Sequence, residues 1–297
     1  MMNKKNGVHF KSSPVRADTN RGGAPWAVSS PPSISQAMRQ FEMHPRNGGA
    51  WMFAVLFFFI VSFQKRKSLE SSKITTVKIT FNNKVKNYKI TLHDSVYTNP
   101  FGEKYTITKL RYYISDISLI SDGKVFSEKN SYHLIDESDQ ESKSFSLTIA
   151  EGNYSSLKFL LGVDSLHNVS GAQIGALDPA KDMFWTWNTG YVMAKLEGNS
   201  PSSTLVNNKY EYHIGGFAGK YNVLKNIELN FSQNKPMHFA AGKKTEIIIN
   251  ADINTWWQNP NDIKIAGHAN ITSPGKLALM ISDNYAKMFH IEKIISE

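Results

Sequence analysis

The densest group of chemically versatile side chains lies at residues 184–191, which read Phe-Trp-Thr-Trp-Asn-Thr-Gly-Tyr. If this segment is extended, strand alternation places Trp185 and Trp187 on the same face. Two neighbouring indoles can anchor a core or an interface, form a stacking platform for a sugar, or include a redox-active indole. Composition favours the core anchor, because tryptophan buries well and needs only one hydrogen-bond partner. The residues by themselves leave all three interpretations open.

Histidine is the other residue type that could bind a ligand. None of the histidines after residue 67 forms a His-x-His or His-x-x-x-His pair, so a metal site would have to be assembled from distant strands. We expect His213 and His133 to be the best ligand candidates, with His167 ranked below them. His213 ends a predicted strand before two glycines that allow close backbone approach, and alternation places His133 on the face opposite its neighbours. The histidines of this region are His93, His133, His167, His213, His238, His268 and His290.

The chain contains no cysteine. Disulfides, thiolate metal ligands and thiol nucleophiles are therefore excluded, and a soft-metal site would have to use His, Met or modified side chains. The sequence also lacks a Gly-x-Ser-x-Gly nucleophile motif, a P-loop, a dinucleotide fingerprint and a His-Glu-x-x-His motif. No pair of carboxylates can be nominated as acid and base. We predict that the protein is not an enzyme.

The positive charge is concentrated at the N-terminus. The formal net charge is +9, yet residues 68–297 carry 24 Lys/Arg against 23 Asp/Glu. A nearly neutral domain lacks the electrostatic footprint of a polyanion-binding protein, so we expect no nucleic-acid partner.

Short alternating runs begin at residue 74 and predict β-strands. Residues 252–257 and 277–289 are the two places with helical character. We therefore predict a single all-β domain over residues 68–297, an antiparallel β-sandwich with a short C-terminal helix. The irregular stretch 164–189 is long for a compact domain, which favours a functional loop. The predicted strands are residues 76–81, 88–92, 105–110, 112–120, 132–135, 145–149, 157–163, 191–196, 211–214, 226–231 and 245–250.

The N-terminal region differs in composition from this domain. Residues 1–48 have no apolar periodicity and predict a disordered extension. Residues 49–67 form a predicted signal or anchor segment around an uncharged run of 14 residues at 50–63. That run is short for a membrane-spanning helix and suits the core of a signal peptide. Cleavage and retention as a membrane anchor both remain open.

Eight sequence blocks, taken in order, resemble the MbnP-like domain family. They cover nearly all of residues 74–290, and their combination is more specific than any one of them. The blocks are residues 110–115 (Leu-Arg-Tyr-Tyr-Ile-Ser), 131–136 (Ser-Tyr-His-Leu-Ile-Asp), 162–165 (Gly-Val-Asp-Ser), 168–173 (Asn-Val-Ser-Gly-Ala-Gln), 175–179 (Gly-Ala-Leu-Asp-Pro), 183–191, 212–216 (Tyr-His-Ile-Gly-Gly) and 283–289 (Asp-Asn-Tyr-Ala-Lys-Met-Phe).

The resemblance implies a methanobactin-associated, copper-binding protein in the periplasm or on the cell surface. It implies a diheme partner enzyme, similar to MbnH, that oxidises a tryptophan of the MbnP protein. Carried over to this chain, Trp185 and Trp187 become the candidates for modification, and His213 and His133 become the candidate copper ligands. The alternative is a non-catalytic β-sandwich module that binds a glycan or a protein through the aromatic loop.

Overall fold

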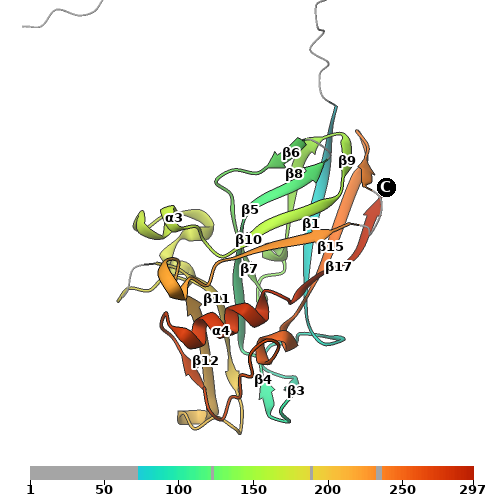
Figure 1. Cartoon of the computed structure of the whole chain (residues 1–297). Coiled ribbons are helices and arrows are strands. Elements are labelled where there is room, and N and C mark those ends of the chain that lie inside the picture. The colour runs from blue at the N-terminus through green and yellow to red at the C-terminus, as the bar shows by residue number, and fades with distance from the viewer. Residues whose placement is uncertain (1–72, 122–123, 188–189, 232–235) are drawn as a thin grey trace, which may run out of the picture. The chain divides into compact units, whose positions relative to one another are not determined.

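The computed structural model describes residues 73–121, 124–187, 190–231 and 236–297 (Figure 1). The predicted disordered extension and the predicted signal or anchor segment lie outside these residues. Ser68–Glu297 forms one compact unit. None of the helices in the described part of the chain has the length and apolar composition needed to traverse a lipid bilayer.

The first sheet has five strands and is mixed. Its central strand β1 (Ile74–Val85) runs parallel to β15, with Thr76 opposite Lys244, and antiparallel to β8 and β2 on the other edge. The prediction of a purely antiparallel sandwich is therefore wrong at β1 and β15, although the predominance of β-strands is confirmed. Strand alternation reveals burial on one face but carries no information on the direction of the neighbouring strand. The remaining strands are β15 (Lys244–Asp252), β17 (Phe289–Ser296), β8 (Ser144–Ala150) and β2 (Tyr88–Lys89).

The second sheet has eight strands built around the long strand β5 (Lys109–Ser121). On one edge, β5 pairs first with β11 and then with β10, and on the other edge it pairs with β7 and then with β6. Strand β5 therefore lies at the centre of the sheet. Beyond it, β12 pairs with β11 and β13 pairs with β10. The bounds are β6 (Lys124–Ser127), β7 (Tyr132–Asp136), β10 (Ser156–Leu161), β11 (Val192–Asn199), β12 (Lys209–Gly215), β13 (Lys225–Asn230) and β16 (Asn270–Ile271).

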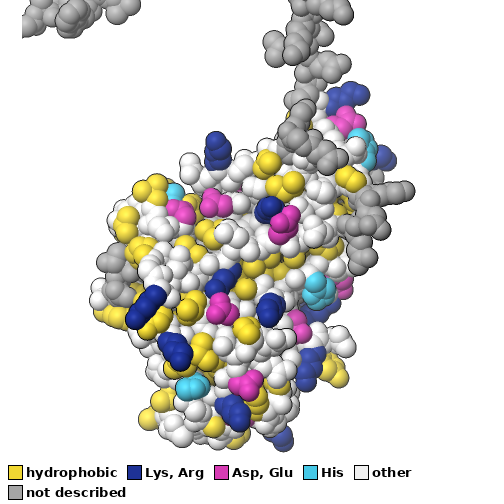
Figure 2. All heavy atoms as spheres, viewed as in Figure 1, with side chains coloured by type: hydrophobic (Ala, Val, Ile, Leu, Met, Phe, Trp, Pro, Cys, Tyr) yellow, Lys and Arg dark blue, Asp and Glu magenta, His cyan; other side chains and the backbone are white. Residues whose placement is uncertain are grey.

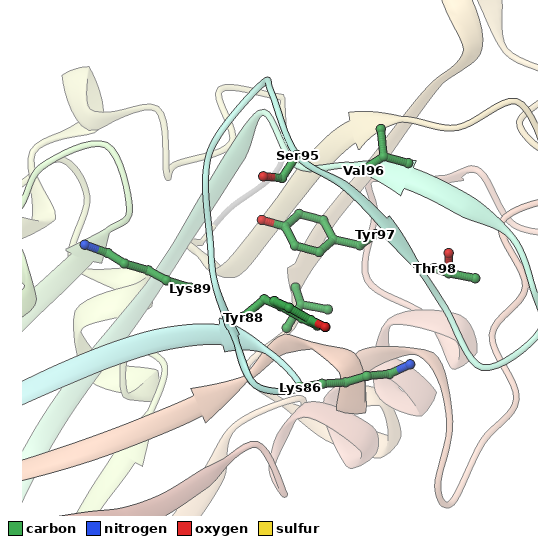
Figure 3. A pocket seen from close by; sticks show the side chains of 8 residues that line it. Lys86, Tyr88, Lys89, Ser95, Val96, Tyr97 and Thr98 are labelled. Atoms are coloured by element: carbon green, nitrogen blue, oxygen red, sulfur yellow. The ribbon is translucent and has the colours of Figure 1, made fainter.

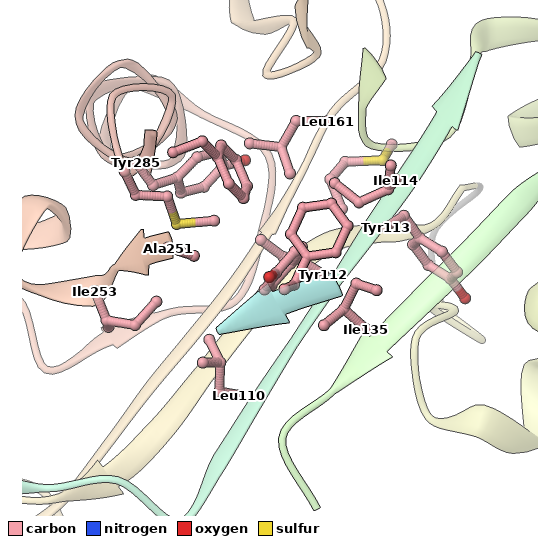
Figure 4. Close-up of a cluster of buried hydrophobic side chains, with 14 of the residues drawn as sticks. Leu110, Tyr112, Tyr113, Ile114, Ile135, Leu161, Ala251, Ile253 and Tyr285 are labelled. Carbon is pink, nitrogen blue, oxygen red and sulfur yellow. The ribbon is translucent and has the colours of Figure 1, made fainter. Parts of the chain in front are cut away.

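The two sheets pack face to face through aromatic rings. Phe81 of β1, which is 1% exposed, lies 6.1 Å from the ring of Tyr112 on β5 and 6.1 Å from Phe159 on β10. Phe145 of β8 and Phe289 of β17 complete this cluster. Figure 4 shows how Leu110, Tyr112 and Ile135 of the second sheet point into the same interior. Edge-to-face pairs of this kind add to the free energy of apolar burial, so this cluster holds the sandwich together.

Helix α4 (Lys276–Tyr285) covers part of β12 and the adjoining 3-10 helix η7 (Ile253–Trp257) (Figure 1). The predicted helix over 277–289 is too long, because Phe289 begins β17, which pairs antiparallel with β15. The helix is therefore not the C-terminal element. Strand β17 lies at the sheet edge with most of its residues partly or fully exposed, which is why its sequence lacks clean alternation.

The loop between β10 and β11 packs on the outer face of the second sheet, the face turned away from the first sheet. Tyr113 of β5 donates a hydrogen bond to the carbonyl of Ala176 at 3.0 Å, and Tyr191 donates one to the carbonyl of Leu177 at 2.8 Å. We call residues 162–187 and 190–191 the covering loop. It contains α3 (Ser165–Val169) and the 3-10 helices η3 (Gly175–Leu177) and η4 (Pro179–Lys181).

The smaller elements complete the fold. They are the hairpin of β3 (Val96–Thr98) and β4 (Lys104–Thr106), the pair of β9 (Gly152–Tyr154) and β14 (Met237–Phe239), and the 3-10 helices η2 (Glu141–Lys143), η5 (Val206–Asn208) and η6 (Gly219–Tyr221). The predicted strand over 105–110 is divided between β4 and the start of β5.

Replacing Phe81 by alanine should lower the free energy of unfolding by about 3–5 kcal/mol, because it removes the ring that contacts both sheets. Denaturant unfolding followed by circular dichroism measures this change. Ile74→Ala on the same strand, where the side chain is 61% exposed, should cost less than about 1 kcal/mol. Equal losses in the two variants would contradict the central role of Phe81.

Candidate functional site

Trp185 packs directly on the backbone of β12. A Cβ atom at Gly215 would lie 2.4 Å from Cη2 and 2.6 Å from Cζ3 of this indole. Only glycine leaves room for the ring at this position, and Trp185 is consequently 6% exposed. Gly215 follows His213 by two residues on one strand, so the tryptophan and the histidine occupy the same, outer face of the sheet.

Trp187 stands beside Trp185 but faces solvent. The ring centroids are 5.4 Å apart with an interplanar angle of 42°, and Trp187 is 64% exposed. The pair therefore joins one buried indole to one exposed indole. A platform of two exposed rings is not present, and neither is a pair buried wholly in the core. Asn188 and Thr189 of the predicted aromatic block lie outside the described residues.

His213 is held by a carboxylate on the neighbouring strand. Its Nε2 lies 2.8 Å from Oε1 of Glu197 on β11. Although burial alone would raise the pKa of Glu197, the hydrogen bond from His213 and the nearby lysines lower it. Glu197 is thus an anion that fixes the orientation of the imidazole, as carboxylates do for histidine ligands in metal sites.

A row of charged side chains continues from His213 across four strands of the outer face. Register places His213 beside Lys195, Lys195 beside Arg111, and Arg111 beside Asp136. Arg111 Nε contacts Asp136 Oδ2 at 2.7 Å. Strand pairing therefore assembles this row from residues far apart in the chain, and no local sequence motif predicts it.

Asp182 of the covering loop connects the loop to this row. Its carboxylate Oδ2 lies 2.9 Å from Nζ of Lys109 and 2.9 Å from Nζ of Lys195. The Lys195 ammonium, whose side chain is only 3% exposed, also donates to the Asp182 carbonyl at 2.5 Å. Burial lowers the pKa of Lys195, and Asp182 opposes that effect. Burial would raise the pKa of Asp182, but hydrogen bonds from Lys195 and Lys109 lower it to about 2.

His133 lies in a different part of the molecule. It pairs with Ile114 on the inner face of the sheet, and its ring stacks on Phe145 at 3.6 Å. Its Nε2 contacts Ser131 and Glu128, at 2.8 Å and 3.1 Å. The structure thus separates His133 from His213 by the sheet itself, so the two candidate copper ligands lie on opposite faces. Alternation along β7 does not show which strands lie between the two histidines.

In the described ranges, no group of three or more His, Asp or Glu side chains has the arrangement of a metal centre. Around His213, the unmodified residues provide one imidazole and the carboxylate that orients it. The indole of Trp185 has an N–H donor and no lone pair for a metal. The residues present therefore do not make a two-histidine copper site.

The sequence places His167 below His213 and His133 as a ligand candidate, and it does not predict the side chains that His167 contacts. Asp164 caps helix α3 through Oδ1, which accepts hydrogen bonds from the backbone N–H groups of Leu166 and His167. Its other oxygen, Oδ2, lies 2.8 Å from His167 Nδ1 and accepts a short hydrogen bond from Tyr132. The Asp-x-x-His spacing at the start of a helix indicates the contact between Asp164 and His167. The contact with Tyr132 depends on the position of β7, which the local sequence does not indicate.

Two surface features lie apart from the predicted site residues. A cavity of about 530 Å³ is lined by Val85, Lys86, Tyr88 and Tyr97 among others (Figure 3), and no predicted site residue contributes to it. Figure 2 shows basic and acidic side chains interspersed over one face of the protein, without a field of a single sign.

Gly215→Ala should displace Trp185 and reduce the free energy of unfolding by about 1–3 kcal/mol, because the added methyl overlaps the indole. Chemical denaturation and near-ultraviolet circular dichroism report stability and ring packing. Gly267→Ala is the matched control, since the nearest atom to its Cβ is 3.9 Å away. A Gly215→Ala protein with the stability and aromatic spectrum of the parent would contradict the close contact.

Asp182→Asn should destabilise the protein near neutral pH and have little effect below pH 2. The folded-state pKa of about 2 lies under the ordinary value of 3.8. Stability from the charged form is therefore present above pH 4 and is lost as the pH falls through about 2. We expect about 1 kcal/mol at neutral pH, allowing for screening of a side chain that is 58% exposed. Unfolding curves from pH 7 to pH 2 should converge; a constant difference would contradict the ion-pair contribution.

Comparison with known proteins identifies the family of this chain. The MbnP family model matches residues 74–274. Among solved structures, MbnP from Methylosinus trichosporium aligns with 75% of this chain and 99% of its own, at 12% identity and a TM-score of 0.45. No curated protein matches the sequence. The family match spans more than half of the chain, and the protein therefore belongs to the MbnP family.

Proposed function

We propose that this chain is an extracytoplasmic copper-binding protein, acting as a carrier or sensor, whose tryptophan is oxidised by a partner diheme enzyme. The observation that carries the proposal is the position of Trp185, packed on Gly215 two residues from His213. Membership of the MbnP family supports it. Trp185 and His213 are distant in sequence, and both lie on the outer face of β12.

The donor chemistry supports His213 as the protein's imidazole ligand. Imidazole suits copper. Glu197 orients the ring through Nε2, so the copper ligand in this proposal is the other ring nitrogen, Nδ1. Oxidation of the Trp185 indole would add an oxygen or nitrogen donor that the native ring lacks. His133 has no part in this site, because it lies on the other face of the sheet.

The two indoles have different roles in this proposal. Trp187, at 64% exposure, presents the pair to the partner enzyme, and Trp185 lies on the side of His213. The centroid distance of 5.4 Å places the rings in direct contact. Both remain candidates for modification, and contact between them links the exposed ring to the buried one.

The compartment and the lack of catalysis belong to the same proposal. We place the domain in the periplasm or on the cell surface, exported or anchored through residues 50–63. The absence of cysteine agrees with a copper site built from imidazole and a modified indole. The protein itself carries out no reaction and serves as the substrate of the diheme oxidase.

Exposed apolar side chains on the covering loop favour a second function, binding of a glycan or protein partner. Ile174 is 89% exposed and Trp187 is 64% exposed. Exposed aromatic and aliphatic groups on an ordered loop are typical of contact surfaces. This function requires Trp187 but neither His213 nor an oxidised indole.

The test is copper content and intact mass of the full chain purified from its own host. We expect stoichiometric copper, and added oxygen mapped by peptide mass spectrometry to Trp185 or Trp187. His213→Ala should lose the copper, because it removes the imidazole ligand of the proposed site. His238→Ala, a surface histidine beside Asn153, should retain it.

Metal-free protein of unmodified mass that takes up no added copper would refute the copper proposal. If Trp187→Ala then abolished binding to a glycan or protein while His213→Ala did not, the contact surface would be the function. Copper retained in the His213→Ala variant would show that the site lies elsewhere in the chain.

A further inference from the structure

A cavity lies between the turn that joins β1 to β2 and the strand β3. Its volume of about 530 Å³ falls within the range of about 300–1,000 Å³ that is typical of small-ligand sites. Figure 3 shows the Tyr97 ring between Ser95 and Tyr88, with Lys86 and Lys89 on opposite sides of the two rings. The lining thus combines two aromatic rings, two ammonium groups and hydroxyl groups.

Tyr97 provides a buried hydrogen-bond donor in the wall of this cavity. Its side chain is 7% exposed, and its ring centroid lies 5.7 Å from that of Tyr105. The Tyr97 hydroxyl accepts a hydrogen bond from the backbone N–H of Thr91 at 2.9 Å. Within the described residues, the proton of that hydroxyl has no acceptor. A phenol can donate and accept at once, so a ligand oxygen in the cavity would complete its hydrogen bonding.

The charge of the cavity is positive. Lys86 and Lys89 line it, no Asp or Glu does, and neither lysine forms an ion pair with any residue that the structure describes. Pairing of β1 with β2 places Lys89 directly opposite Lys84, which already pairs with Glu292 at 3.0 Å. Like charges opposite each other on paired strands repel. An anion beside Lys89 would relieve that repulsion.

The elements that carry these groups are held in place. Lys86 has φ of 56° at the turn, and its backbone N–H donates to Asp252 Oδ1 at 2.8 Å. Asp252 therefore fixes the turn without neutralising the Lys86 ammonium, and neither Asp252 nor the neighbouring Asp94 lines the cavity. The Tyr97 ring is fixed by its packing on Tyr105. The binding groups are consequently arranged before a ligand arrives, which reduces the entropy lost on binding.

We propose that this cavity binds an anionic saccharide, a sugar residue that carries a carboxylate or a phosphate group. Lys86 and Lys89 would bind the anionic group, and Tyr97 would donate to a sugar oxygen. Tyr88, which is 71% exposed, would pack against the apolar face of the sugar ring. The site is independent of His213 and of copper, and it is distinct from the aromatic loop that contains Trp187.

The mixture of groups favours a sugar over other anions. A saccharide presents C–H groups, hydroxyls and an anionic group on one small ring, which matches exposed aromatic surface, hydroxyls and ammonium groups in one cavity. Ser95 and Thr98 supply further hydroxyls. A nucleic acid is a poor match, because residues 68–297 carry 24 Lys/Arg against 23 Asp/Glu and lack an extended basic surface.

The test is calorimetric titration of the full chain at low salt with two ligands, trigalacturonate and glucose 6-phosphate. We expect saturable binding of at least one of them, which identifies the anionic group as carboxylate or phosphate. The uncharged methyl ester of trigalacturonate should bind at least about tenfold more weakly than a bound trigalacturonate, because it lacks charge-assisted hydrogen bonds. Raising sodium chloride to about 0.5 M should also weaken binding, because salt screens exposed charges.

Variants locate the site in this cavity. Lys86→Gln and Lys89→Gln should each weaken binding by about fivefold or more, since each removes one charged donor. Tyr88→Ala should weaken binding of both the charged ligand and any residual binding of the methyl ester. All three side chains are exposed, so thermal unfolding should show each variant folded like the parent.

Lys276→Gln, an exposed lysine on α4, is the matched charge control and should bind like the parent. Trp187→Ala and His213→Ala should also bind normally, which separates this site from both functions proposed above. The proposal is overturned if neither anionic sugar binds, if the methyl ester binds as tightly as trigalacturonate, or if Lys86→Gln and Lys89→Gln leave the affinity unchanged. Tighter binding of a hexaglutamate peptide than of either sugar would also overturn it, because the site would then be one for acidic peptides.

Discussion

The buried ammonium of Lys195 is the constraint on which the outer face of the second sheet depends. A charge on a side chain only 3% exposed must be compensated, and Asp182 supplies both a carboxylate and a carbonyl at hydrogen-bond distance. Asp182 belongs to the covering loop, so compensating the strand's charge also fixes the loop. Trp185 follows three residues later and is thereby brought down onto Gly215.

This arrangement explains why the covering loop can be ordered despite its irregular backbone. Tyrosine hydroxyls of Tyr113 and Tyr191 bind its carbonyls, and Arg111 donates to the carbonyl of Lys181 at 2.8 Å. These bonds give the carbonyls of an irregular segment the partners that a helix or strand would supply through its own backbone. The loop is therefore held by polar contacts that involve both its backbone carbonyls and its own side chains Asp182 and Tyr191.

The outer face therefore contains two distinct polar regions under one loop. Near β12, His213 and Glu197 lie beside a row of balanced ion pairs and next to Trp185. Near β7, Tyr132, Asp164 and His167 share hydrogen bonds. Strand β5 carries residues of both regions, since its two edges pair with β11 and with β7. Its length lets one sheet present two polar regions of different composition.

The sequence by itself determined the class of fold, the family and the identity of the residues worth examining. Alternation predicts burial on one side of a strand, and the absence of cysteine restricts the donors, so His213 and the Trp185–Trp187 pair could be selected in advance. Only the tertiary structure decided that His133 lies on the inner face and that Trp185 is buried while Trp187 is exposed. It also decided that β1 and β15 are parallel and that Tyr132 meets His167. These outcomes depend on which strands become neighbours, and pairing between distant segments is set by packing of the whole core, which no local pattern of residues encodes.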